Sequence, residues 1–123
     1  MALLLVGVVD FARVFYFDVV TSGAAMEAAR AAASGLPDND VYAVARTSAP
    51  SWMSSDLALA ITPSSSTRAA LGTTPVWTTG TASYMFTPLT PLTSTFMGSS
   101  ITFTRKVSQR MRTPCVNSAT ATC

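Results

Sequence analysis

The sequence predicts an α+β fold in which a long, protruding N-terminal helix packs on a small antiparallel β-sheet. Residues 1–34 contain no proline, and one continuous helix of that length is a rod of about 50 Å at roughly 1.5 Å per residue. Residues 56–62 and 100–111 alternate apolar and polar side chains instead, as half-buried strands do. A chain of 123 residues is long enough for one domain. We divide it into an N-terminal hydrophobic helix, residues 1–36, and a globular part, residues 37–123.

Side chains spaced three and four residues apart give the first helix an apolar stripe. The stripe consists of Leu4, Val8, Phe11, Phe15, Ser22, Met26, Ala29 and Ala33, and Asp18 interrupts it. The charged residues on the opposite arc are Asp10, Arg13, Glu27 and Arg30. In each acidic and basic pair the partners stand three residues apart, so they pair either within one helix or between neighbouring copies of the chain.

The second half of this helix, residues 22–33, is mostly alanine. Ala24, Ala28 and Ala32 repeat at the four-residue spacing that lets helix backbones approach closely. We expect this half to pack against another helix and to cover the apolar face of the sheet. The helix should end at residues 34–37, because Gly35 suits a left-handed cap and Pro37 cannot continue the helix.

The first half, residues 1–17, carries large apolar side chains all round the rod. A helix that is apolar on every side must be buried on every side. We therefore predict that residues 1–17 contact only other copies of the protein or lipid. A signal peptide begins with basic residues, and none precedes the apolar start of this chain. A membrane-spanning helix needs about 20 apolar residues, and charged residues interrupt this segment before that length is reached. Either an upstream segment is missing, or the helix spans a membrane only in part.

The remaining elements are short. Residues 37–40 offer acidic side chains to cap a second helix, which Pro50 must end. Residues 56–62 form a strand with Leu57, Leu59 and Ile61 on one face, and residues 63–67 end it. Residues 75–86 form either a strand pair or one long bent strand, with Gly80 at a turn or bulge.

The chain closes with a crossover at residues 88–97 that holds one turn of helix, and with a last strand at residues 100–111. The apolar side chains of that strand point inward: Ile101, Phe103, Val107 and Met111. Short links between successive strands predict an antiparallel meander of three or four strands.

Composition argues against an enzyme. The chain has no histidine and only two cysteines, and its six acidic residues are scattered without a catalytic motif. We expect no catalytic residue, no cofactor and no metal site. The net charge of +2 is too small to favour nucleic acid as a partner. Lys106, Arg110 and Arg112 either bind polyanions or, as the sequence alone favours, lie on a solvated outer face.

The two cysteines, Cys115 and Cys123, enclose seven residues at the C-terminal end. We favour a disulfide between them over two unpaired thiols. Such a bond would place the mature protein in an oxidising compartment.

Motifs at both ends of the chain point to one family. Residues 7–13 are GVVDFAR and residues 24–32 are AAMEAARAA; later, residues 84–92 are YMFTPLTPL, residues 98–104 are GSSITFT and residues 111–112 are MR. In this order they resemble the TadE-like pilins of tight-adherence secretion systems. The family's corresponding patterns are "G-I-x-D-F-x-R", "A-A-x-E-A-A-R" and "Y-x-F-x-P-L-x-P-L … I-T-L-T … M-R". The two segments that these motifs span, residues 7–32 and 84–112, cover about half of the chain.

The resemblance implies a pilin-like fold and a structural role. A subunit of this kind waits in the cytoplasmic membrane and is then assembled by pilus machinery into an extracellular, cell-surface filament, a helical homo-oligomer that serves adhesion. The candidate assembly residues on the first helix are Leu4, Val8, Asp10, Phe11, Arg13, Phe15, Ala24, Glu27, Ala28 and Arg30. Two alternatives stay open: a membrane-anchored accessory or binding protein that never polymerises, and a minor or tip pilin.

Overall fold

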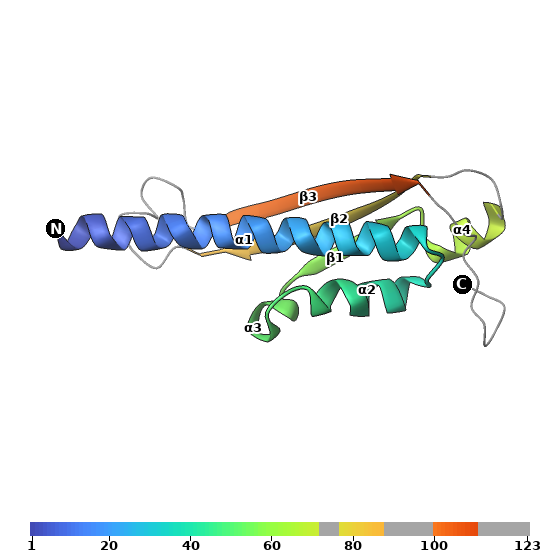
Figure 1. The fold of residues 1–123 in the computed structure, drawn as a ribbon, viewed down its shortest axis with the longest axis horizontal. Coiled ribbons are helices and arrows are strands. Elements are labelled where there is room, and N and C mark those ends of the chain that lie inside the picture. Colours follow the sequence, from blue (N-terminus) through green and yellow to red (C-terminus); the bar gives the residue numbers. More distant parts are fainter. Residues whose placement is uncertain (72–76, 88–99, 111–123) are drawn as a thin grey trace.

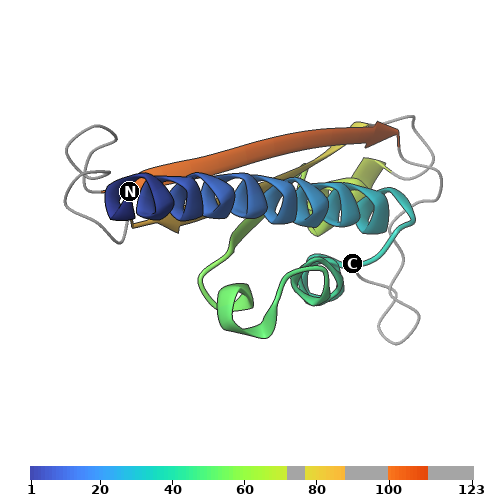
Figure 2. The same ribbon diagram turned by 60° about the vertical axis from the view of Figure 1, so that its left-hand side comes forward.

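The computed structural model describes residues 1–71, 77–87 and 100–110, and its fold is α+β as predicted (Figure 1). The described helices and strands are α1 (Ala2–Ala33), α2 (Asp38–Thr47), α3 (Ser51–Ser54), β1 (Ala58–Thr62), α4 (Ser65–Leu71), β2 (Trp77–Phe86) and β3 (Ile101–Arg110). The three described strands form one antiparallel sheet in the order β1-β2-β3. The helix α1 runs nearly along the strands, and its first turns extend beyond them (Figures 1 and 2).

The long first helix and its end confirm the sequence prediction. It continues for 32 residues and stops at Ala33. Gly35 has a φ of 91°, a left-handed conformation that glycine adopts without a steric penalty. The N–H groups of Gly35 and Leu36 donate to the carbonyls of Ala32 and Ala31 at 3.1 and 3.3 Å, so the helix end is capped by its own backbone.

The face of α1 that packs on the sheet is not the predicted apolar stripe. Its fully buried residues are mostly small: Asp10, Phe17, Thr21, Ala24, Ala25, Ala28, Ala29, Ala31, Ala32 and Ala33. Of the predicted stripe, Ala29 and Ala33 are buried, whereas Leu4, Val8, Phe11, Phe15 and Met26 are exposed. The prediction ranked positions by apolar size, but near Gly80 the helix lies so close to the strands that only small side chains fit between them.

Gly80 of β2 shows how close that approach is. A Cβ atom at this position would lie 2.5 Å from the carbonyl oxygen of Ala25 and 2.8 Å from the backbone nitrogen of Ala29. The predicted turn or bulge at Gly80 is wrong, because the residue pairs regularly with Ile61 on one side and Val107 on the other. Residues 77–86 form one strand, and glycine is needed there to admit the backbone of α1.

The alanine-rich half of α1 also packs against α2, as expected. Ala28 and Ala32 form a buried cluster with Val41 and Ala45 of α2 and with Ile61 of β1. Small side chains therefore serve two contacts at once, one with a helix and one with the sheet.

Near the other end of the sheet, Phe17 is the centre of an aromatic cluster. Its ring centroid lies 4.9 Å from that of Tyr84, 5.1 Å from that of Phe86 and 5.8 Å from that of Trp52. Val14 packs on the same core. The prediction that residues 1–17 contact only other copies or lipid is therefore wrong for part of the segment, because Asp10 and Phe17 are buried within their own chain.

The smaller elements follow the sequence with three exceptions, which are the start of α2 and the two unpredicted helices α3 and α4. The predicted acidic cap of α2 is wrong, because the N-cap position is Pro37, whose side chain cannot accept a hydrogen bond. The Asp38 carboxylate, in the first turn, lies 2.9 Å from Arg68. Helix α4 was not predicted in its serine-rich segment. The strand predicted at residues 56–62 is confirmed, with Leu57 and Ile61 buried and Leu59 partly buried. The apolar residues of β3 pack on the core as predicted. The crossover at residues 88–97, Met111 and the pair Cys115 and Cys123 lie outside the described residues.

Candidate functional site: the exposed apolar surface of the first helix

The N-terminal half of α1 exposes an extensive apolar surface. Residues 1–9 are all exposed, and the described strands do not reach their end of the rod (Figure 1). Apart from the first N–H groups of the helix, the backbone polar groups bond within the helix, so the side chains of this end offer neighbours only hydrocarbon. It can bind another apolar surface and has no chemistry for catalysis.

A stripe of apolar side chains, interrupted at Ser22, extends this surface along the helix face that points away from the sheet. We call it the outer stripe; its members are Leu4, Val8, Phe11, Phe15, Val19 and Met26. Phe11 and Phe15 are in edge-to-face contact with ring centroids 4.9 Å apart. From exposed fractions of 42–73% and typical side-chain areas, the stripe exposes roughly 600 Å² of apolar area, at the upper limit for the largest patch on a soluble monomer.

Asp10 and Arg13 lie on the side of α1 that faces the fold. Asp10 is only 1% exposed, and its carboxylate lies 3.7 Å from the Arg13 guanidinium. Arg13 also lies over the ring of Phe86, at 5.2 Å, and near that of Phe17, at 5.8 Å. Cation–π contacts of this kind add to the ion pair. Of the two pairing modes predicted for Asp10 and Arg13, the structure contains the one within a single helix.

Ala24 and Ala28 are completely buried within the chain. While this fold persists, these two candidate assembly residues contact their own sheet and α2, and not a neighbouring copy.

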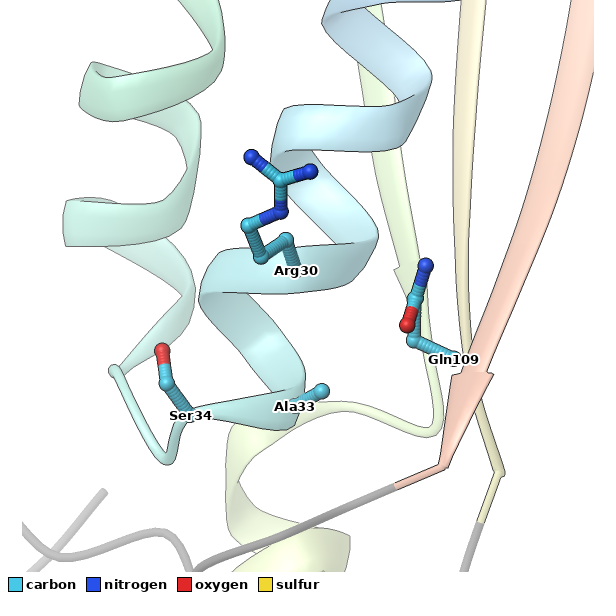
Figure 3. A pocket seen from close by; sticks show the side chains of 4 residues that line it. All are labelled: Arg30, Ala33, Ser34 and Gln109. Atoms are coloured by element: carbon cyan, nitrogen blue, oxygen red, sulfur yellow. The ribbon is translucent and has the colours of Figure 1, made fainter.

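Glu27 and Arg30 pair on the surface near the end of α1, at 3.1 Å. Arg30 also borders a hollow of about 290 Å³ together with Ala33, Ser34 and Gln109 (Figure 3). Figure 3 shows these side chains coming from α1, the turn that follows it and β3. The hollow falls just below the range of about 300–1,000 Å³ usual for small-molecule sites, and its described lining is more polar than apolar.

Sequence reasoning missed two ion pairs that hold elements together. Arg68 of α4 is fully buried; it pairs with Asp38 and donates to the backbone carbonyls of Pro63 and Leu36 at 2.9 and 2.8 Å. Asp18 accepts a hydrogen bond from Nε of Arg105 at 2.7 Å, which ties α1 to β3. The only signal for the second pair was Asp18 itself, a charge within an apolar stripe.

The part of the chain that the structure describes holds no cluster of three or more His, Cys, Asp or Glu side chains suited to a metal ion. Within that same part, no helix has both the length and the apolar character of a membrane span. Comparisons with protein-family models, curated proteins and solved structures found no match to this chain.

Proposed function

We propose that this protein is a structural, pilin-like subunit of an extracellular filament, and that it assembles through the outer stripe and the exposed end of α1. The resemblance to TadE-like pilins suggests this role. The observation that carries it furthest is the exposure of large apolar side chains at residues 1–9 and along the outer stripe. In the proposed life cycle the subunit is held at the cytoplasmic membrane and passed by assembly machinery into a surface filament that serves adhesion.

The energetics of burial support assembly by this surface. At 58% exposure, Phe15 leaves roughly 110 Å² of ring and Cβ in water, and burying that area contributes about 3 kcal/mol at ~25 cal/mol per Å². Because neighbouring copies repeat the same contact, a helical array turns a patch that is costly for one subunit into a continuous core. In such an array Asp10 remains paired with Arg13 of its own subunit, and apolar contacts hold neighbouring subunits together.

The test compares two equally exposed apolar residues on different surfaces. Phe15 on the outer stripe and Met85 on β2 are 58% and 62% exposed. In the native host, Phe15→Glu should prevent recovery of filaments by shearing and electron microscopy, and Met85→Glu should leave them unchanged. Circular dichroism of both purified variants checks that each remains folded.

Three results would decide against the proposal or narrow it. Filaments of normal abundance from Phe15→Glu would show that the outer stripe is not an assembly surface. A wild-type protein recovered only from the membrane fraction, and never as a fibre, would favour the non-polymerising anchored protein. Antibody labelling confined to the tips of fibres would identify a minor or tip pilin.

A further inference from the structure

The face of the sheet turned away from α1 carries an unusual set of side chains. Thr78, Gly80 and Ala82 of β2 are buried beneath the helix, so the alternate residues of the strand must lie on the opposite face. We call this the outer face. Its residues on β2 are Trp77, Thr79, Thr81, Ser83 and Met85, and directly opposite them on β3 are Arg110, Ser108, Lys106, Thr104 and Thr102.

One end of the outer face combines an aromatic ring, hydroxyl groups and two cations. Trp77 is 64% exposed and lies opposite Arg110, while Thr81 lies opposite Lys106. Between these two pairs, the hydroxyls of Thr79 and Ser108 are hydrogen-bonded at 2.8 Å. Paired strands hold directly opposite side chains about 5 Å apart on one face of the sheet. The sheet therefore presents an indole, hydroxyls and cations together without the need for any rearrangement.

The positive charge of this face is not neutralised by the chain's own acids. All six acidic residues occur in residues 1–56, and residues 57–123 contain five basic residues and no acidic one. Four of the acids pair with arginines: Asp10 with Arg13, Asp18 with Arg105, Glu27 with Arg30, and Asp38 with Arg68. Among the described residues, neither Lys106 nor Arg110 has a carboxylate within ion-pair distance.

We propose that this end of the outer face binds an acidic polysaccharide, one whose sugars carry carboxylates, with Trp77, Lys106 and Arg110 as the main contacts. The exposed indole offers a flat apolar plane to the C–H face of a sugar ring and an N–H donor at its edge. Arg110 fits a carboxylate in a two-pronged hydrogen bond, and Lys106 adds a mobile positive charge. The threonine and serine hydroxyls donate to and accept from sugar hydroxyls.

Nucleic acid fits this face less well. Proteins that bind a phosphate backbone tightly neutralise several phosphates at once, and non-specific single-strand binding uses a series of aromatic platforms. The described part of the outer face has two cations and one aromatic ring. Its hydroxyls outnumber both, which favours a ligand rich in hydroxyl groups.

The test measures binding of polygalacturonate to the full-length protein by titration calorimetry, with fully methyl-esterified polygalacturonate as the uncharged form of the same polymer. Polygalacturonate should bind and the ester should bind at least about tenfold more weakly, because its carboxylates no longer reach Arg110 and Lys106 as charges. Trp77→Ala should weaken binding about tenfold, as loss of one stacking contact does elsewhere. The double variant Lys106→Gln/Arg110→Gln should show a loss of the same order or larger.

Two matched variants control for general effects. Met85→Ala removes an equally exposed apolar side chain from the far end of the same face, and Arg46→Gln removes an exposed cation from α2. Both should bind as the wild type does. This inference does not depend on assembly, because the assay reports on the outer face of the sheet and not on α1.

Several outcomes would overturn the proposal. Equal binding of the ester would show that carboxylates are not recognised. Equal losses from Arg46→Gln and from Lys106→Gln/Arg110→Gln would show that only net charge matters. Unchanged binding by Trp77→Ala, together with tighter binding of single-stranded DNA, would identify a nucleic-acid surface instead. Absence of any binding by the wild-type protein would refute the site altogether.

Discussion

A single added methyl group at Gly80 tests the packing of α1 on the sheet. The Cβ of Gly80→Ala would lie 2.5 Å from the Ala25 carbonyl oxygen and 2.8 Å from the Ala29 nitrogen. Both are backbone atoms, so no side chain can rotate out of the way. Restoring ordinary contact distances of about 3.5 Å requires the helix and strand to separate by roughly 1 Å.

The cost of that separation is large for so small a change. A gap of about 1 Å loses up to half of each dispersion contact along the alanine face, and overpacking of this kind costs about 3 kcal/mol. That corresponds to a fall in melting temperature of about 10 °C for a chain of this size. The measurement is urea and thermal unfolding followed by far-ultraviolet circular dichroism.

Gly23→Ala is the matched control, because it adds the same methyl group to α1 where nothing lies within 4 Å of the new atom. Alanine is the better helix former, so this variant should gain about 0.5–1 kcal/mol. Opposite signs for the two variants are the expected result. If Gly80→Ala were as stable as the wild type, the close approach of α1 to β2 would be refuted.

Three further predictions concern the same fold. Ala28→Leu should lower the free energy of unfolding by about 2–3 kcal/mol in urea titrations, because Ala28 is fully buried and has no room for a larger side chain; Ala43→Leu, at an exposed position on α2, should change it by less than about 0.5 kcal/mol. Arg68→Met should cost about 3 kcal/mol of unfolding free energy, because it removes a fully buried guanidinium from the Asp38 carboxylate and two carbonyls; an effect no larger than that of exposed Arg46→Met would contradict this role. Deletion of residues 1–8 should leave the melting temperature unchanged, whereas deletion of residues 1–17 should lower it because Phe17 is lost from the aromatic cluster. Equal melting temperatures for the two truncated proteins would count against that cluster.

The sequence allowed the course of the chain to be predicted better than the contacts of its first helix. The helix could be delimited because proline is absent before its end and Gly35 and Pro37 follow it. The strands could be found because their apolar residues alternate. These are local signals, each carried by neighbouring residues.

The orientation of α1 could not be predicted from such signals, because it depends on a glycine about fifty residues away. The apolar stripe through Phe11 and Phe15 exists, but it is exposed to solvent. The alanine face packs on β2 instead, because Gly80 has no side chain to keep the helix away. Asp10 was placed on the arc opposite the apolar stripe; at its position that arc faces the fold, and Asp10 is buried beside Arg13. A charge that has a nearby partner can lie inward, and sequence alone does not reveal which partner is near.

The sequence predicted most residues of the candidate assembly surface but not all of them. Leu4, Val8, Phe11 and Phe15 were identified from their spacing, and the structure places all four on the exposed side of the helix. Val19 escaped because Asp18 breaks the pattern beside it, and Asp18 itself turned out to bind Arg105. Lys106 and Arg110 were named from the sequence, which favoured a solvated face over polyanion binding. They were not connected with Trp77, because the three residues meet only through strand pairing.

The near-parallel course of α1 and the strands has a mechanical consequence. A pull on the exposed end of the helix would act along its axis, and therefore along the line of β2 and β3 as well (Figure 1). Load in that direction shears the whole alanine face over Gly80 at once, together with the Asp18–Arg105 link and the Phe17 aromatic cluster. Contacts loaded in shear must yield together, whereas contacts that are peeled apart yield one by one. The fold therefore resists tension most strongly along the axis of its own projecting helix.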